Sequence, residues 1–126
     1  MFVLERKDNS IRVRFSKEEV RVIHQAFNEV CHGYEVNDFR QVIGVEKEAA
    51  ISEMQKLRSA YLNLKEGDEN KSHIELSVTT DQLRVFINTL NEVDREMDHK
   101  WEFHSRMGTH KENVQELVSG LVKAVS

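Results

Sequence analysis

Several features that often reveal a protein's chemistry are missing from this sequence. It contains a single cysteine, Cys31, which cannot form an internal disulfide and therefore fits a reducing compartment. Its five glycines are isolated, so neither a phosphate-binding loop nor a dinucleotide-binding fingerprint occurs. No apolar run approaches the roughly 18 residues of a membrane span, and the start MFVLERKDNS lacks the pattern of a secretory signal. We therefore expect a cytoplasmic protein without a membrane partner.

Charge of neither sign dominates the chain. Its 22 acidic and 18 basic residues give a net charge of -4, which provides no general attraction to phosphate backbones or anionic lipids. At 126 residues the chain has the length of one domain and can bury roughly two-thirds of the surface that it exposes when unfolded. Any nucleic-acid function would therefore need a local basic patch.

What the sequence does contain is an internal repeat. The residues from Ile11 onward align with those from Ile74 onward, and both halves contain the string NEV and the pattern F-x4-G-x2-KE in the same order. Shared helix propensity rarely reproduces two such strings in register, so we interpret the chain as a tandem duplication of residues 11–62 and 74–126. The matched positions that we expect to matter for structure are Phe39 with Phe103 and Gly44 with Gly108.

Each half has the pattern of a strand, a helix, a short helix and a final helix. IRVRFS and IELSVT alternate apolar and polar residues, as half-buried strands do. Ser16 and Glu19 have the spacing of a capping box, and Thr79 occupies the corresponding place in the second half. Short helices are expected at residues 39–43 and 103–107, each ending at the matched glycine. The final helix of the first half has apolar positions that end with Tyr61.

Other local signals mark the ends of these elements. Gly33 is expected to end the first long helix in the left-handed conformation, and Thr109 with Glu112 has the spacing of another capping box. KDNS suits the turn of a hairpin whose first strand covers residues 2–6. The polar residues 63–73 are expected to form an exposed linker between the halves.

The expected fold is a single α+β domain, residues 1–126, with pseudo-two-fold symmetry. A lone strand cannot satisfy its own backbone hydrogen bonds, so the strands of both halves should join a small antiparallel sheet of about three strands. The strand of residues 2–6 would form one edge, and the helices would cover one face. Each half is too small to bury its apolar stripe alone, which favours one domain over two.

The candidates for chemistry are histidines and the single thiol. His99, His104 and His110 are separated by five and six residues across a glycine, whereas metal ligands on a helix usually stand at i and i+4. Cys31 and His32 are adjacent, and adjacent side chains on a helix diverge, which argues against a thiolate and its base. We therefore interpret the histidines as surface residues and expect no catalytic residue, metal, cofactor or enzymatic activity.

The segments FRQVIGVEKEAAISEMQKL and FHSRMGTHKENVQELVSGL resemble the helix-turn-helix family. Each has an apolar residue, Ile43 or Met107, before a turn glycine, followed by regularly spaced apolar positions. The resemblance implies that the second helix of each segment is offered to the major groove of DNA. These helices mix acidic with basic residues, whereas DNA-binding surfaces supply Lys and Arg to neutralise phosphates. A helix-turn-helix-like DNA-binding regulator is therefore the alternative function, and nucleic acid is disfavoured as a partner.

Two polar positions recur on the long helix of each half without an evident role in the core. Arg21 and Asn28 recur as Arg84 and Asn91, and at about 100° per residue they fall opposite the apolar stripe. They either contact other helices of their own half or form a recognition face. Trp101 is a second interface candidate, although a core position suits a tryptophan equally well. The sequence thus predicts a non-enzymatic protein-interaction or regulatory module, whose partner is another protein or a second copy of the chain.

Overall fold

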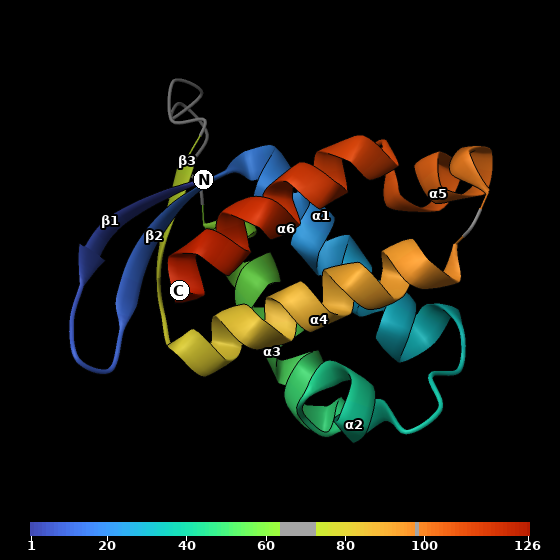
Figure 1. Ribbon diagram of the computed structural model, residues 1–126, viewed down its shortest axis with the longest axis horizontal. Helices are drawn as coiled ribbons and strands as arrows, with labels where there is room; N and C mark the ends of the chain where they lie inside the picture. Colours follow the sequence, from blue (N-terminus) through green and yellow to red (C-terminus); the bar gives the residue numbers. More distant parts are fainter. Residues whose placement is uncertain (64–72, 98) are drawn as a thin grey trace.

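The computed structural model describes residues 1–63, 73–97 and 99–126, so most of the expected linker lies outside the described residues. A small sheet stands at one side of a layer of helices (Figure 1). The fold is α+β, which confirms the expected class. Its elements in chain order are β1 (Phe2–Arg6), β2 (Ile11–Ser16), α1 (Lys17–Asn28), the π-helical turn η1 (Glu29–Gly33), α2 (Phe39–Ile43), α3 (Lys47–Leu62), β3 (His73–Val78), α4 (Thr80–Glu96), α5 (Lys100–Met107) and α6 (Lys111–Val125).

The sheet has the strand order β1-β2-β3, and both neighbouring pairs are antiparallel. The register between β2 and β3 runs without irregularity from Ile11 opposite Val78 to Ser16 opposite His73. Alternate residues of β2 are buried against the helices, because successive side chains of a strand point to opposite faces. The strand of residues 2–6 lies at an edge of the sheet, as predicted.

Reciprocal side-chain caps begin the two long helices. Before α1, Ser16 Oγ accepts a hydrogen bond from the Glu19 N–H at 3.0 Å, and the Glu19 carboxylate accepts one from the Ser16 N–H at 2.7 Å. Thr79 and Gln82 make the same pair before α4, at 3.0 and 2.8 Å. These bonds satisfy N–H groups that have no partner within a helix, and both predicted helix starts are confirmed. No helix of the described residues combines the length and the apolar character needed to cross a membrane.

The predicted left-handed end of the first helix at Gly33 is wrong. Among the glycines that the structure describes, those with positive φ are Gly44 and Gly108, whereas α1 widens into η1 and the chain then becomes extended. A Cβ at position 33 would collide with the Glu29 carboxylate and the Arg106 guanidinium. Close packing between η1 and α5 therefore explains this glycine.

The predicted capping box at Thr109 is also wrong. The helix α6 begins after His110, whose side chain makes no capping hydrogen bond. Thr109 is buried, and its hydroxyl accepts a hydrogen bond from Asn113 Nδ2 at 3.1 Å. The threonine therefore stabilises the first turn of α6 from inside the protein and does not cap it.

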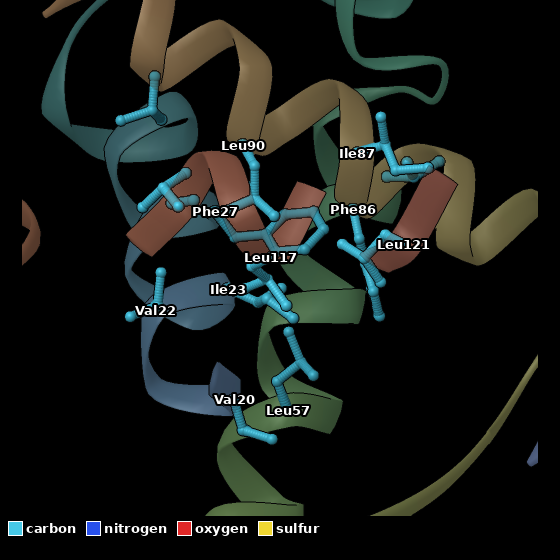
Figure 2. Packing of buried hydrophobic residues seen from close by; sticks show 14 of the residues in the cluster. Val20, Val22, Ile23, Phe27, Leu57, Phe86, Ile87, Leu90, Leu117 and Leu121 are labelled. Carbon is cyan, nitrogen blue, oxygen red and sulfur yellow. The ribbon is translucent and has the colours of Figure 1, made fainter. Parts of the chain in front are cut away.

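The core lies between the helices and the inner face of the sheet, and both halves of the chain contribute to it. Phe27 of α1 and Phe86 of α4 meet edge to face near its centre, with ring centroids 5.8 Å apart and planes at 84° (Figure 2). Val20 and Leu57 are seen together at one end of the same cluster. Because α1 packs against α3 as well as α4, this end of the core lies at the junction of α1 and α3.

Two matched glycines end the short helices. Gly44 follows α2 with φ +102°, and Gly108 follows α5 with φ +67°. Each faces the long helix of the opposite half, since a Cβ at Gly44 would lie 3.3 Å from Asn88 Nδ2 and one at Gly108 would lie 2.8 Å from Arg21 Nη1. Thus α2 packs on α4, and α5 packs on α1. A duplicated unit accounts for this reciprocal arrangement, although the duplication itself stays a prediction from the sequence.

Candidate interaction site

Arg21 lies on α1 with its guanidinium against the end of α5. Its Nη1 donates to the Met107 carbonyl at 3.2 Å, and its Nη2 donates to the Gly108 carbonyl at 3.0 Å. Hydrogen bonds with Glu18 raise the pKa of Arg21 and lower the pKa of Glu18. Carbonyls at a helix C-terminus lack partners and form the negative end of the helix dipole. Arg21 therefore joins the two halves of the chain and does not contact its own half alone.

The side chains at the other recurring positions make fewer hydrogen bonds within the protein than Arg21 does. Asn28 is half-buried, and Asn91 is exposed on α4. Arg84 is 58% exposed and pairs with Asp81 at 3.3 Å on the surface. The recurrence of arginine at aligned positions therefore does not reflect the same contact in both halves.

Sequence reasoning missed the aligned pair that does make equivalent contacts, Gln25 and Asn88. Gln25 Nε2 donates to the Arg106 carbonyl at 3.0 Å, and Asn88 Nδ2 donates to the Ile43 carbonyl at 3.0 Å. Each amide thus satisfies a carbonyl near the end of the short helix of the other half. A search for identical residues overlooks the pair, whereas a search for chemically similar residues at aligned positions finds it.

Trp101 lies in the first turn of α5 with 76% of its surface exposed. No hydrogen bond or ring contact among the described residues joins it to the other four candidates. Arg21 and Asn28 lie on α1, Arg84 and Asn91 lie on α4, and the helices that flank these faces, α5 and α2, are far apart in Figure 1. The five candidates are therefore distributed over three helices, α1, α4 and α5.

Two buried glutamates, one in each NEV string, were also missed. Glu29 is paired with Arg106 of α5, and Glu92 is paired with Arg95 at 2.8 Å. The hydroxyl of Tyr34 donates to Glu92 at 3.5 Å, while burial and the charge of Glu92 raise the pKa of Tyr34. Burying a carboxylate is costly unless it is paired, so the ion pairs with Arg106 and Arg95 compensate for the burial of the two glutamates. The recurrence of a glutamate beside the apolar stripe of each long helix was the sequence pattern that could have indicated these buried residues.

Two of the three histidines considered as metal ligands lie together on the surface. The rings of His104 and His110 stack with centroids 4.5 Å apart and planes at 29°, and both residues are exposed, as is His99. In the part of the chain that the structure describes, no group of three or more His, Cys, Asp or Glu residues is placed to hold a metal ion. Cys31 is buried, and burial raises the pKa of its thiol, whereas His32 is exposed.

The helix-turn-helix-like segments correspond to α2 followed by α3 and to α5 followed by α6. Two of the basic side chains at these turns, Arg40 and Lys111, make contacts within the protein. Lys111 Nζ donates to the Asp94 carbonyl at 2.7 Å and lies 5.3 Å from the centroid of the Phe103 ring, and Arg40 pairs with Glu46 at 3.5 Å. A surface that contacts phosphates needs such cations to be free.

A groove of about 320 Å³ opens between α1 and α3. Its floor consists of Val20 and Leu57, which are buried, and its wall consists of Tyr61 and Leu62, which are 37% and 64% exposed. The fully buried residues of α3 are Ala50 and Leu57, so the last turn of this helix leaves apolar surface uncovered. The position at which we expected the apolar pattern to end, Tyr61, is therefore on the surface. The remaining lining residues are Arg21, His24 and Arg58.

The groove has a positive rim. Every other arginine forms an ion pair or donates to a backbone carbonyl, whereas Arg58 does neither with any described residue. Lys17 Nζ lies 5.7 Å from the centroid of the Tyr61 ring. Burial and the charge of Arg58 lower the pKa of His24, because both disfavour the charged imidazolium. None of the described lining residues carries a carboxylate.

Two further hollows differ from this groove in their charge. The hollow of about 530 Å³ between α1 and α6 is lined by Glu18, Glu19, Glu116 and Lys123, and the N-terminal ammonium pairs with Glu19 there. The hollow of about 480 Å³ between α3 and α4 contains charges of both signs. The groove between α1 and α3 instead combines an apolar floor with cationic edges and is the candidate interaction site.

No protein family, no characterised protein and no solved structure matches this chain. Because a fold by itself does not imply a function, the surface of this protein is the basis for a functional proposal.

Proposed function

We propose that this protein is a non-enzymatic interaction module that binds a segment of another protein in the groove between α1 and α3. The observation that carries the proposal is the uncovered apolar wall formed by Tyr61 and Leu62 next to the floor of Val20 and Leu57. Single exposed apolar residues are ordinary, but contiguous apolar surface with a polar rim is typical of binding sites. Covering Leu62 would contribute about 1–2 kcal/mol to binding.

The distribution of polar groups supports a contact surface over a reaction centre. Catalysis requires a nucleophile, base or metal to converge on one point, and the thiol, the histidines and the buried glutamates of this chain are dispersed or internally paired. The polar lining residues of the groove, Arg21, His24 and Arg58, are partly or largely exposed. This arrangement favours recognition of a side chain or helix face over chemistry on a small substrate.

The proposal assigns different roles to the residues predicted from the sequence. Arg21 lines the groove and fixes the adjoining face of α1 to α5. Asn28, Arg84, Asn91 and Trp101 lie outside the groove, and a part for them in a second contact stays a prediction. We expect the protein to act in the cytoplasm, where a lone thiol stays reduced.

Site-specific cross-linking tests this proposal. A photo-reactive amino acid would replace Leu62, and the control would carry it in place of Val122, an apolar residue of α6 that is 44% exposed. We expect a partner to be cross-linked from position 62 and not from position 122, and Leu62→Asp to abolish capture by the unmodified protein. Equal yields from both positions, or turnover of a small substrate by the purified protein, would contradict the proposal.

A further inference from the structure

We propose that the segment bound between α1 and α3 is an acidic amphipathic helix, whose apolar side chains enter the groove and whose carboxylates face Arg58 and Lys17. This inference rests on the proposed function, since it specifies the occupant of the same site.

The shape of the groove suits a helix. Its lining positions follow helical spacing on both sides, so that one face of α1 and one face of α3 form two ridges with a trough between them. A third helix can pack along such a trough and place residues at i, i+3, i+4 and i+7 in it. The volume of about 320 Å³ is at the lower end of the roughly 300–1,000 Å³ of small-ligand pockets. The lining residues on α1 are Val20, Arg21 and His24, and those on α3 are Leu57, Arg58, Tyr61 and Leu62.

The positive charge of the groove favours a negatively charged partner. Arg58 lacks an ion pair or carbonyl acceptor among the described residues, in contrast to every other arginine of the chain. The two acidic residues of α1 are already paired, Glu18 with Arg21 and Glu19 with the N-terminal ammonium. A carboxylate on the partner would therefore pair with a guanidinium that is free of competing partners, and guanidinium and carboxylate groups match in geometry.

The overall charge of the protein does not oppose this choice. The net charge of -4 repels an acidic partner at long range, but physiological salt screens charges beyond about 8 Å. Within contact distance, Arg58 and Lys17 attract the carboxylates of a partner whose apolar side chains lie on Val20 and Leu57. A basic helix would bring like charges together at the same place, which is costly at an interface. The charge of the groove, and not the net charge of the protein, therefore favours an acidic over a basic partner helix.

The opposite half of the chain offers an internal comparison. At the aligned positions of α4 and α6, neutral residues replace Lys17, His24 and Arg58, and the aligned cation that remains is Arg84. Val122 is the exposed apolar residue there. The aligned pairs are Lys17 with Thr80, His24 with Ile87, and Arg58 with Val122.

Fluorescence polarisation with three labelled peptides tests the inference. The first peptide has leucine at i, i+3, i+4 and i+7 with glutamate at the flanking positions, the second replaces each glutamate by lysine, and the third replaces each leucine by serine. We expect the first to bind and the other two to bind at least tenfold more weakly. Arg58→Glu should weaken the first peptide roughly fivefold or more, because an attraction becomes a repulsion.

Matched variants show whether a loss of peptide affinity comes from a change in the groove or from any similar change on the protein surface. Arg84→Glu makes the same change of charge at an exposed arginine elsewhere, and it should leave the affinity within about twofold. Leu62→Asp should abolish binding, while Val122→Asp should not. Circular dichroism of each variant identifies any loss of folding.

The outcomes distinguish this inference from the proposed function. Equal affinity for the glutamate and lysine peptides, lost on Leu62→Asp, overturns the acidic partner and retains the groove as a binding site. Absence of binding by all peptides up to about 1 mM overturns both. A dimer that forms without peptide and dissociates on Arg58→Glu also overturns the inference, because the occupant is then a second copy of the chain.

Discussion

Replacing Gly44 by alanine is expected to lower the free energy of unfolding by about 2 kcal/mol, because alanine tolerates this backbone poorly. The φ of +102° lies beyond the roughly +50° to +70° that other residues can adopt, and left-handed conformations cost them about 1–2 kcal/mol. The new Cβ would also lie 3.3 Å from Asn88 Nδ2. The amide must then move away from the Ile43 carbonyl, to which it donates at 3.0 Å, and such a bond contributes about 0.5–1.5 kcal/mol.

Three further variants control for the substitution itself. Gly120 lies inside α6, where a Cβ would stand 3.7 Å from Met1 Sδ in ordinary contact, so Gly120→Ala should stabilise the protein by about 0.5–1 kcal/mol. Gly108→Ala should cost about 1 kcal/mol, since its φ of +67° is more tolerable and the neighbouring guanidinium can shift. His104→Ala should change stability by less than about 0.5 kcal/mol, because His104 is exposed.

Urea denaturation followed by far-ultraviolet circular dichroism measures all four variants. We expect Gly44→Ala and Gly120→Ala to change the free energy of unfolding in opposite directions. Similar small effects at both positions would refute the conformational argument. A larger loss at His104 than at Gly108 would instead make the histidine a structural or chemical centre.

The remaining predictions concern a thiol, an imidazole and DNA. Cys31 is buried with a raised pKa, so a thiol reagent should label it only as the protein unfolds; rapid labelling of the native protein would disprove this. Burial and Arg58 lower the pKa of His24, so its contribution to stability is present above the unfolded pKa near 6.5 and is lost as the pH falls through the folded pKa. Arg58→Gln should raise the pKa of His24 in an NMR titration, and no change would refute their coupling. We expect only weak, salt-sensitive binding to mixed duplex DNA; sub-micromolar binding at moderate salt that is lost on changing Lys47 or Lys111 would favour the helix-turn-helix alternative.

The elements that the sequence predicts well depend on neighbouring residues. The strand at Ile11–Ser16 follows from alternation, and the start of α1 follows from the reciprocal bonds of Ser16 and Glu19. The π-helical turn at Glu29–Gly33 was not predicted, because Arg106, far away in the sequence, contacts both Glu29 and the Gly33 carbonyl. A local pattern carries no information on such a contact.

The candidate site was predicted less well than the fold, for a related reason. The recurrence of Arg21 indicated a role, but its acceptors are carbonyls of α5 in the other half. Tyr61 continues the apolar pattern of its helix, and it is exposed because α1 does not cover the last turn of α3. Likewise, the absence of a partner for Arg58 among the described residues depends on where every nearby carboxylate lies. Exposure and pairing are tertiary properties, and helical periodicity cannot predict them.

Chemical-shift mapping with the glutamate peptide tests the groove most directly. The backbone amides and the His24 ring of isotopically labelled protein would be followed during the titration. We expect saturable shifts that cluster on Val20, His24, Leu57 and Tyr61, and we expect Arg58→Glu to need at least about fivefold more peptide for half-saturation. Shifts centred on Trp101 and α5, or shifts that persist unchanged in Arg58→Glu, would contradict this expectation.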